Sequence, residues 1–197
     1  FSNMDVYYDL EKKNKSIALM CAHYASYEWV VSMNYHINCK GFGIYKKLAN
    51  PYFDKLVKRI RSKFKAELIT TKQTIPTIAE NHKNHVLGLY GFASDQSPKA
   101  NAAYHWAPFM GHIVPVHTGA EMLAKRFDMN VIFLKTKKIK RGYYEASFEI
   151  LSEDVKSVPN YEITDQFLKL VEEQILETPE YYLWTHKRWK HKKENAQ

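Results

Sequence analysis

The sequence has few cysteines and no long apolar segment. Its 197 residues contain two cysteines, Cys21 and Cys39, and neither has a second cysteine at the spacing of a metal site. This pattern excludes a disulfide framework and favours a reducing compartment. No uninterrupted apolar run approaches the roughly 20 residues that a helix needs to cross a bilayer.

Common catalytic and nucleotide-binding motifs are also missing. Gly41-Phe42-Gly43 lacks the third glycine and the following helix of a dinucleotide fingerprint, and there is no Gly-x-Ser-x-Gly elbow. Cys21 lies within an apolar run, so it is not predicted to be a nucleophile. Six histidines suit structural or exposed positions better than ligand positions: His82, His85, His112, His117, His186 and His191. We therefore predict no metal site and no bound cofactor.

Basic residues, by contrast, are abundant. The formal net charge is +8, and residues 40–65 hold nine basic residues against one acid, Asp54. Two further clusters are Lys135, Lys137, Lys138, Lys140 and Arg141, and Lys187, Arg188, Lys190, Lys192 and Lys193 beside Trp184 and Trp189. Such patches attract nucleic acid, anionic lipid headgroups or an acidic carrier protein. For any single cluster, a solvated basic surface explains the charge equally well.

Apolar runs alternate with helical patterns along the chain. Strands are predicted at 16–22, 37–45, 85–92, 113–117, 131–136 and 143–151. Helices are predicted at 26–34, 51–64, 75–84, 120–127 and 164–178. This alternation predicts a single α/β domain over residues 1–197, with a mixed, mainly parallel sheet flanked by helices. The strands from Ile113 onward have shorter connections, which allows antiparallel pairing.

The strongest candidate for chemistry follows the first apolar run. Ile17–Ala22 reads as a buried strand, and His23 and Glu28 come directly after it. Ligand sites in open α/β sheets collect at this edge. A neutral imidazole can take a proton from a hydroxyl, and a carboxylate can orient the ring. We therefore expect His23 to act as a general base and Glu28 to hold it.

A second polar pair, Asp95-Gln96, follows the apolar run at 86–93. Two interpretations are open. Asp95 could reach the same edge of the sheet as His23, or it could cap the turn into Ser97-Pro98, since aspartate is a common turn former.

At this point the pattern resembles the late acyltransferases of lipid A biosynthesis, within the lysophospholipid acyltransferase superfamily. His23 and Glu28 match the superfamily signature of histidine, four residues, then an acid, which the late acyltransferases typically write His-x-Gly-Asn-Trp-Glu. Five further blocks follow in family order: Tyr45–Pro51, Arg59–Phe64, Asp95-Gln96, Phe109–Ala124 and Pro179–Lys190. The resemblance runs from about residue 16 to 193, and the closing block is its most specific part.

The resemblance implies transfer of a fatty acyl chain from acyl carrier protein, or coenzyme A, to a hydroxyl of a membrane glycolipid such as a lipid A precursor. The thioester is then a co-substrate. His23 and Glu28 would be catalytic, while the substrate would contact Ser26, Lys46, Arg61, Asp95 and Gln96. The expected location is the cytoplasmic face of the inner membrane of a Gram-negative bacterium, at an anionic membrane surface. Family members also carry an N-terminal membrane anchor, which we expect to precede this chain.

Departures from the family pattern leave alternatives open. Lys46 replaces an arginine and loses its planar grip on phosphate, so the acceptor could instead be a lysophospholipid or an aminolipid. Ala25, Ser26 and Tyr27 replace the family's glycine, asparagine and tryptophan. A non-enzymatic basic module that binds anionic membrane or nucleic acid is the remaining alternative. Nucleic acid is the weaker partner, because no RNA-binding fingerprint is present.

Overall fold

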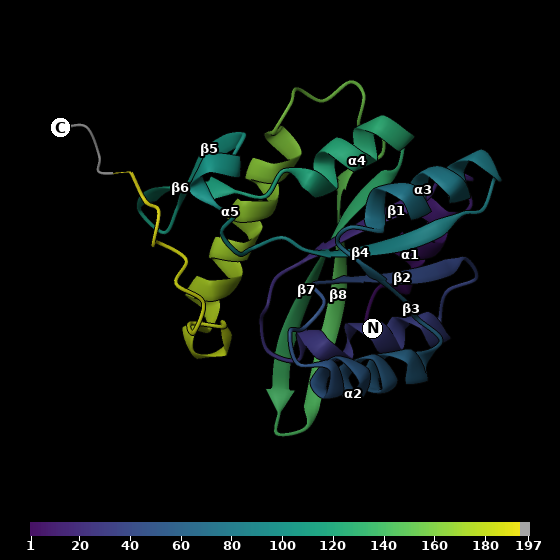
Figure 1. Ribbon diagram of the computed structural model, residues 1–197, viewed down its shortest axis with the longest axis horizontal. Helices are drawn as coiled ribbons and strands as arrows, with labels where there is room; N and C mark the ends of the chain where they lie inside the picture. The colour runs from purple at the N-terminus through teal and green to yellow at the C-terminus, as the bar shows by residue number, and fades with distance from the viewer. Residues whose placement is uncertain (194–197) are drawn as a thin grey trace.

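The computed structural model describes residues 1–193. Its centre is a six-stranded sheet in the order β3-β2-β4-β1-β7-β8, and a separate hairpin pairs β5 with β6 (Figure 1). The strands are β1 (Ile17–Cys21), β2 (Lys40–Tyr45), β3 (Glu67–Thr70), β4 (Gly88–Ala93), β5 (His105–Phe109), β6 (His112–Val116), β7 (Asn130–Lys140) and β8 (Tyr143–Ser152). Five neighbours, from β3 to β7, run parallel, and β8 is antiparallel to β7.

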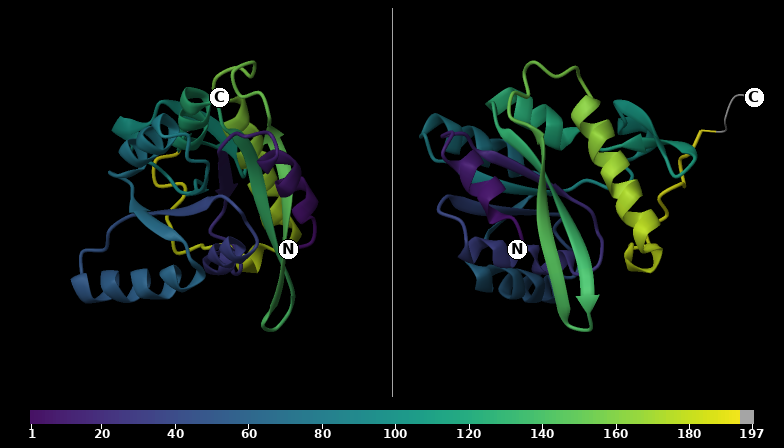
Figure 2. Two further views of the ribbon diagram at one scale, coloured as in Figure 1. Left: turned by 90° about the vertical axis from the view of Figure 1, so that its right-hand side faces the viewer. Right: turned by 180° about the vertical axis from the view of Figure 1, so that it is seen from behind.

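Helices cover both faces of this sheet (Figure 2). The α-helices are α1 (Met4–Glu11), α2 (Pro51–Arg61), α3 (Thr74–Lys83), α4 (Gly119–Phe127) and α5 (Glu162–Glu177). Short 3₁₀ helices are η1 (Tyr27–Tyr35), η2 (Ser62–Phe64), η3 (Ala100–Ala102) and η4 (Pro179–Tyr181).

The central strand β1 is buried on both sides, as its uninterrupted apolar sequence requires. Ala18 and Met20 belong to the larger core, which also includes buried residues of α3, α4 and α5. Ile17, Leu19 and Cys21 belong to the second core, with residues of α1 and η1. Because side chains alternate along a strand, one short segment anchors two layers of helices.

The predicted mixed α/β fold with a mainly parallel sheet is confirmed. Each predicted strand and helix has a counterpart, although the helix predicted at 26–34 is the 3₁₀ helix η1 (Tyr27–Tyr35) rather than an α-helix. Helix α1 and strands β3 and β5 were not predicted. The expectation of antiparallel pairing from Ile113 onward holds for β6 and β8, but β7 is parallel to β1, and β6 lies outside the main sheet.

Candidate active site

The carboxyl ends of β1 and β4 bring two polar side chains together. These strands are parallel neighbours, with Cys21 opposite Ala93 in register. His23 and Asp95 each lie two residues beyond this pair, so the topology sets them side by side. The Nδ1 atom of His23 is 2.7 Å from Oδ1 of Asp95. Of the two interpretations of Asp95, the structure therefore supports the one in which it reaches the edge beside His23.

The environment of this pair favours a fixed histidine tautomer. Asp95 is 1% exposed, whereas the His23 side chain is 20% exposed. A carboxylate accepts hydrogen bonds, so Nδ1 of His23 carries the proton and Nε2 keeps a lone pair. The ring of Tyr27 packs edge-on against His23 at a centroid distance of 4.9 Å. The arrangement is that of a general base with its orienting carboxylate.

Glu28 does not hold His23, contrary to expectation. Its two carboxylate oxygens accept hydrogen bonds from Arg61, at 2.9 Å from Nε and 2.6 Å from Nη2. This two-point ion pair raises the pKa of Arg61. Two side chains five positions apart point about 140° away from each other on a helix, so His23 and Glu28 have no helical route to contact. The 3₁₀ helix η1 begins at Tyr27 and places Glu28 beside Arg61, the last residue of α2. The carboxylate that bonds His23 is that of Asp95.

A strained turn separates His23 from Glu28. Ala25 has φ +48°, a left-handed conformation that costs an alanine roughly 1–2 kcal/mol and a glycine almost nothing. The glycine typical of related acyltransferases at this position suits the backbone better. Ser26 follows as the N-cap residue of η1, but its side chain makes no capping hydrogen bond.

The remaining predicted substrate contacts lie at the same edge of the sheet. Lys46 directly follows β2 and is exposed, while Gln96 follows Asp95 and is half-buried. Neither side chain forms a hydrogen bond or an ion pair with another residue of the described chain, 1–193. Both residues lie at the edge of the sheet that carries His23.

The C-terminal segment 181–189 contacts both chain segments that carry the His23–Asp95 pair. Its backbone bonds to the segment after β1, where Leu183 N donates to the carbonyl of His23 at 3.1 Å. Its side chains bond to the segment after β4, where Ser97 N donates to Nε2 of His186 at 3.0 Å. Burial, followed by the charges of Lys190 and Arg188, lowers the pKa of His186, in keeping with this neutral acceptor role.

Arg188 was expected in an exposed basic cluster, but it is fully buried, with 0% exposure. Its Nη1 donates to Oγ of Ser97 and to the carbonyl of Pro115, each at 3.0 Å, and its guanidinium lies 4.9 Å from the centre of the Phe109 ring. Burial lowers the pKa of Arg188, while the charge of Asp95 opposes that shift. The segment thus supplies a buried cation whose charge interacts with that of Asp95.

Tyr182 is also buried, as are Asp95 and Arg188. Its pKa is raised by burial and further by the charge of Asp95. The sequence assigned no role to Tyr182 and favoured a structural or exposed position for His186. Both residues lie within the closing block Pro179–Lys190, the most specific part of the family resemblance, and this was the one signal available.

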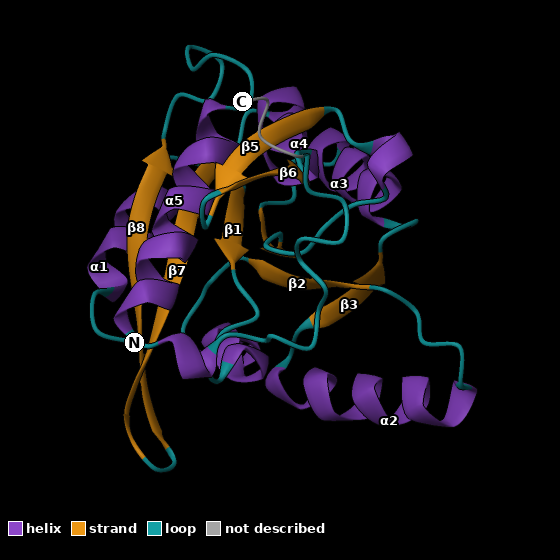
Figure 3. Cartoon of the chain, turned by 90° about the vertical axis from the view of Figure 1, so that its left-hand side faces the viewer, coloured by secondary structure: helices purple, strands orange, loops and turns teal. Residues whose placement is uncertain are grey.

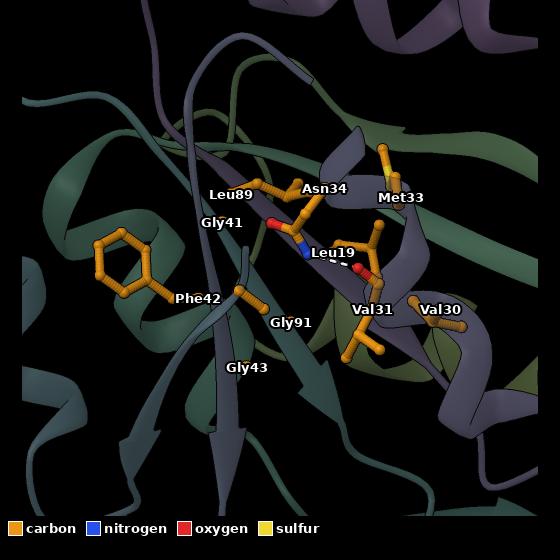
Figure 4. A pocket seen from close by; sticks show the side chains of 11 residues that line it. Leu19, Val30, Val31, Met33, Asn34, Gly41, Phe42, Gly43, Leu89 and Gly91 are labelled. Atoms are coloured by element: carbon orange, nitrogen blue, oxygen red, sulfur yellow. Dashed lines mark hydrogen bonds between the residues drawn. The ribbon is translucent and has the colours of Figure 1, made fainter. Parts of the chain in front are cut away.

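A small apolar cavity lies under η1, lined by the sheet (Figure 4). Its volume is about 60 Å³, with Leu19, Val31, Met33 and Leu89 among its lining residues. Ligand pockets usually measure about 300–1,000 Å³, so this cavity is too small for a fatty acyl chain. Gly41 also lines the cavity. A larger residue does not fit at this position, because a Cβ there would lie 1.6 Å from Oδ1 of Asn34.

Within residues 1–193, no group of three or more potential metal ligands gathers in one place. In the same residues, no helix has both the length and the apolar character that crossing a membrane requires.

The family model of bacterial lipid A biosynthesis acyltransferases matches residues 1–191. The chain belongs to this family. It is therefore an acyltransferase of lipid A biosynthesis, and the match contains His23, Asp95 and the C-terminal segment. The comparison with curated proteins gives no match.

Proposed function

We propose that this acyltransferase moves a fatty acyl chain from acyl carrier protein, or coenzyme A, to a hydroxyl of a membrane glycolipid such as a lipid A precursor. The observation that carries the proposal is the 2.7 Å contact between His23 Nδ1 and Asp95 Oδ1 at the edge of a parallel sheet. It leaves Nε2 of His23 as a base for an acceptor hydroxyl.

In the proposed reaction, Nε2 of His23 takes the hydroxyl proton while the acceptor oxygen bonds to the thioester carbonyl carbon. The buried carboxylate of Asp95 stabilises the imidazolium that forms. The tetrahedral intermediate then collapses, the carbon–sulfur bond breaks, and the leaving thiolate receives the proton from His23. The products are an ester and a free thiol, and no metal or cofactor enters the balance.

Two groups near His23 are suited to negative charge. The amides of Ala25 and Tyr27 already donate to the carbonyls of Tyr181 and Tyr24, but that of Ser26 has no acceptor among residues 1–193. We propose that the Ser26 amide binds the oxyanion of the intermediate. Glu28 fixes the guanidinium of Arg61, whose free N–H groups can bind a headgroup phosphate.

The proposed partners follow from charge. A net charge of +8 suits an acidic carrier protein, and it also suits an anionic membrane surface that presents the glycolipid. The proposed location is the cytoplasmic face of the inner membrane of a Gram-negative bacterium, where acyl carrier protein and a membrane glycolipid can meet. Nucleic acid is not among the proposed partners.

The test is an acyl-transfer assay with purified protein, an acyl carrier protein thioester and a hydroxylated glycolipid precursor. Mass spectrometry should show a product heavier by one acyl chain. His23→Ala should lower turnover by about 10²–10⁴, the usual contribution of a positioned base. His82→Ala, a histidine of α3, is the control and should keep full turnover. Full activity of His23→Ala would refute the proposed base, and transfer to a lysophospholipid alone would refute the proposed acceptor.

A further inference from the structure

Helix α2 carries an apolar stripe that the protein leaves uncovered. Four large side chains remain exposed on it: Tyr52 (83%), Phe53 (60%), Leu56 (40%) and Ile60 (49%). At about 100° per residue these four fall within an arc of roughly 100° on one side of the helix. A stripe of this kind normally faces the core of a soluble domain, so its exposure calls for a partner.

The attachment of α2 to the body explains why the stripe is free. The helix begins with Asn50, whose side chain accepts from Tyr52 N and Phe53 N, and with Pro51 at its first position. Asp54 is buried and accepts from Leu48 N at 3.0 Å, and Arg61 binds Glu28. These two residues lie on the far side of the helix, about 130–150° from the centre of the stripe.

The polar side of α2 carries mostly positive charge. Lys55, Lys58 and Arg59 are exposed there, and Asp54, the single acid of the helix, is buried next to Lys58. An exposed apolar stripe beside a basic side is the pattern of a helix that lies in the plane of a membrane interface. An acidic carrier protein could also bind the positive charge, but such binding would not explain why four apolar side chains are exposed on one side of the helix.

The hairpin of β7 and β8 reaches the same end of the molecule. Strand β7 is parallel to β1, with Leu134 opposite Cys21, and it continues to Lys140. At about 3.3 Å per residue, it therefore projects roughly 20 Å past the end of β1 that leads to His23. Its tip exposes Ile139 and Tyr143 among basic residues. Figure 3 shows α2 lying across the same end of the molecule towards which the β7–β8 hairpin projects.

We infer that α2 docks flat on an anionic bilayer through Tyr52, Phe53, Leu56 and Ile60, with the β7–β8 tip as a second contact. This orientation turns the carboxyl end of β1, and with it His23, towards the lipid surface. The inference rests on the proposed lipid-modifying function for its purpose, but its test needs neither acyl donor nor acceptor.

The experiment is co-sedimentation of the purified chain with phosphatidylcholine vesicles, with and without about one-third phosphatidylglycerol. Phe53→Gln/Ile60→Gln should lower partitioning onto the anionic vesicles by about tenfold or more, because two apolar contacts are lost. Lys55→Gln/Arg59→Gln should lower it by about 25-fold, at roughly fivefold per basic residue near the surface. The matched control is Ile75→Gln, since Ile75 lies on α3 and is 48% exposed, close to the 49% of Ile60; it should bind as the unchanged chain does.

Several outcomes would overturn the inference. One is unchanged vesicle binding by Phe53→Gln/Ile60→Gln. Another is a loss of acyl carrier protein binding, measured without vesicles, while vesicle binding persists. A third is a dimer in sedimentation velocity that only this double variant disrupts, again with normal vesicle binding. An inactive chain that still binds vesicles through α2 would instead refute the proposed function alone.

Discussion

The ring of His23 bonds Asp95, which is 72 residues away in the sequence, although Glu28 is five residues away. A carboxylate that orients an imidazole must lie in its plane within hydrogen-bond reach, and it must stay ionised when buried. Asp95 lies within hydrogen-bond reach of His23 at 2.7 Å, and its charge interacts with that of the buried Arg188. Glu28 is tied to Arg61 by two hydrogen bonds, and we propose that it positions that guanidinium.

Substitution of the two acids separates these roles. Asp95→Asn keeps the shape but removes the charge that stabilises the imidazolium, so kcat should fall by about 10²–10⁴ with little change in KM. Glu28→Gln releases Arg61, and its main effect should be a higher KM for the phosphorylated acceptor. Steady-state kinetics of both variants make the comparison. A larger kcat loss for Glu28→Gln than for Asp95→Asn would reverse the assignment.

Among the elements, the C-terminal segment 181–189 has no regular secondary structure beyond one short turn, yet it connects the strand ends that carry His23 and Asp95. It does so through backbone bonds on one side and through His186 and Arg188 on the other. A buried arginine costs several kcal/mol in desolvation unless its hydrogen bonds and a nearby negative charge compensate. Its presence therefore indicates that the segment is fixed in the folded domain.

Removal of this cation should weaken the fold. Arg188→Met loses the bonds to Ser97 and Pro115 and leaves Asp95 without its buried counter-charge, so the free energy of unfolding should fall by about 2–4 kcal/mol. Urea denaturation measures this change. The control is Lys190→Met, an exposed basic residue two positions further on, which should stay within about 0.5 kcal/mol. Equal effects of the two substitutions would contradict the buried role of Arg188.

For the molecule as a whole, the junction between the C-terminal segment and the sheet makes stability depend on pH. His186 must be neutral to accept from Ser97 N, and its pKa is lowered from 6.5 by burial and by neighbouring positive charges. Between the lowered pKa and 6.5, the unfolded chain holds a proton that the folded chain does not. The free energy of unfolding therefore rises with pH across this window, and the contribution of His186 is lost as the solution is acidified.

His186→Gln tests this linkage. A glutamine oxygen can accept from Ser97 N but does not titrate, so stability should vary less steeply with pH just below 6.5 than it does in the unchanged chain. Urea denaturation at several pH values gives both slopes. Identical slopes would show that His186 does not titrate differently in the folded and unfolded states.

The sequence by itself determined the layers of this protein and the edge of the sheet at which we propose that its chemistry lies. The uncharged run Ile17–Ala22 required a strand buried on both faces, and strands that alternate with helices required a mainly parallel sheet, because burial and periodicity are local properties. The position of His23 directly after this run placed it at the edge where parallel strands end. The motifs, which occur in the same order as in the late acyltransferases, indicated the family.

Tertiary structure decided which groups meet at that edge. The parallel register of β1 and β4 placed Asp95 beside His23, and the turn at Ala25 directed Glu28 away to Arg61. Burial converted Arg188 from an apparent surface charge into an internal cation, whereas the way α2 is attached left its apolar stripe outside. These outcomes depend on contacts between residues far apart in the chain, and periodicity and composition, which are read along the chain, do not record such contacts.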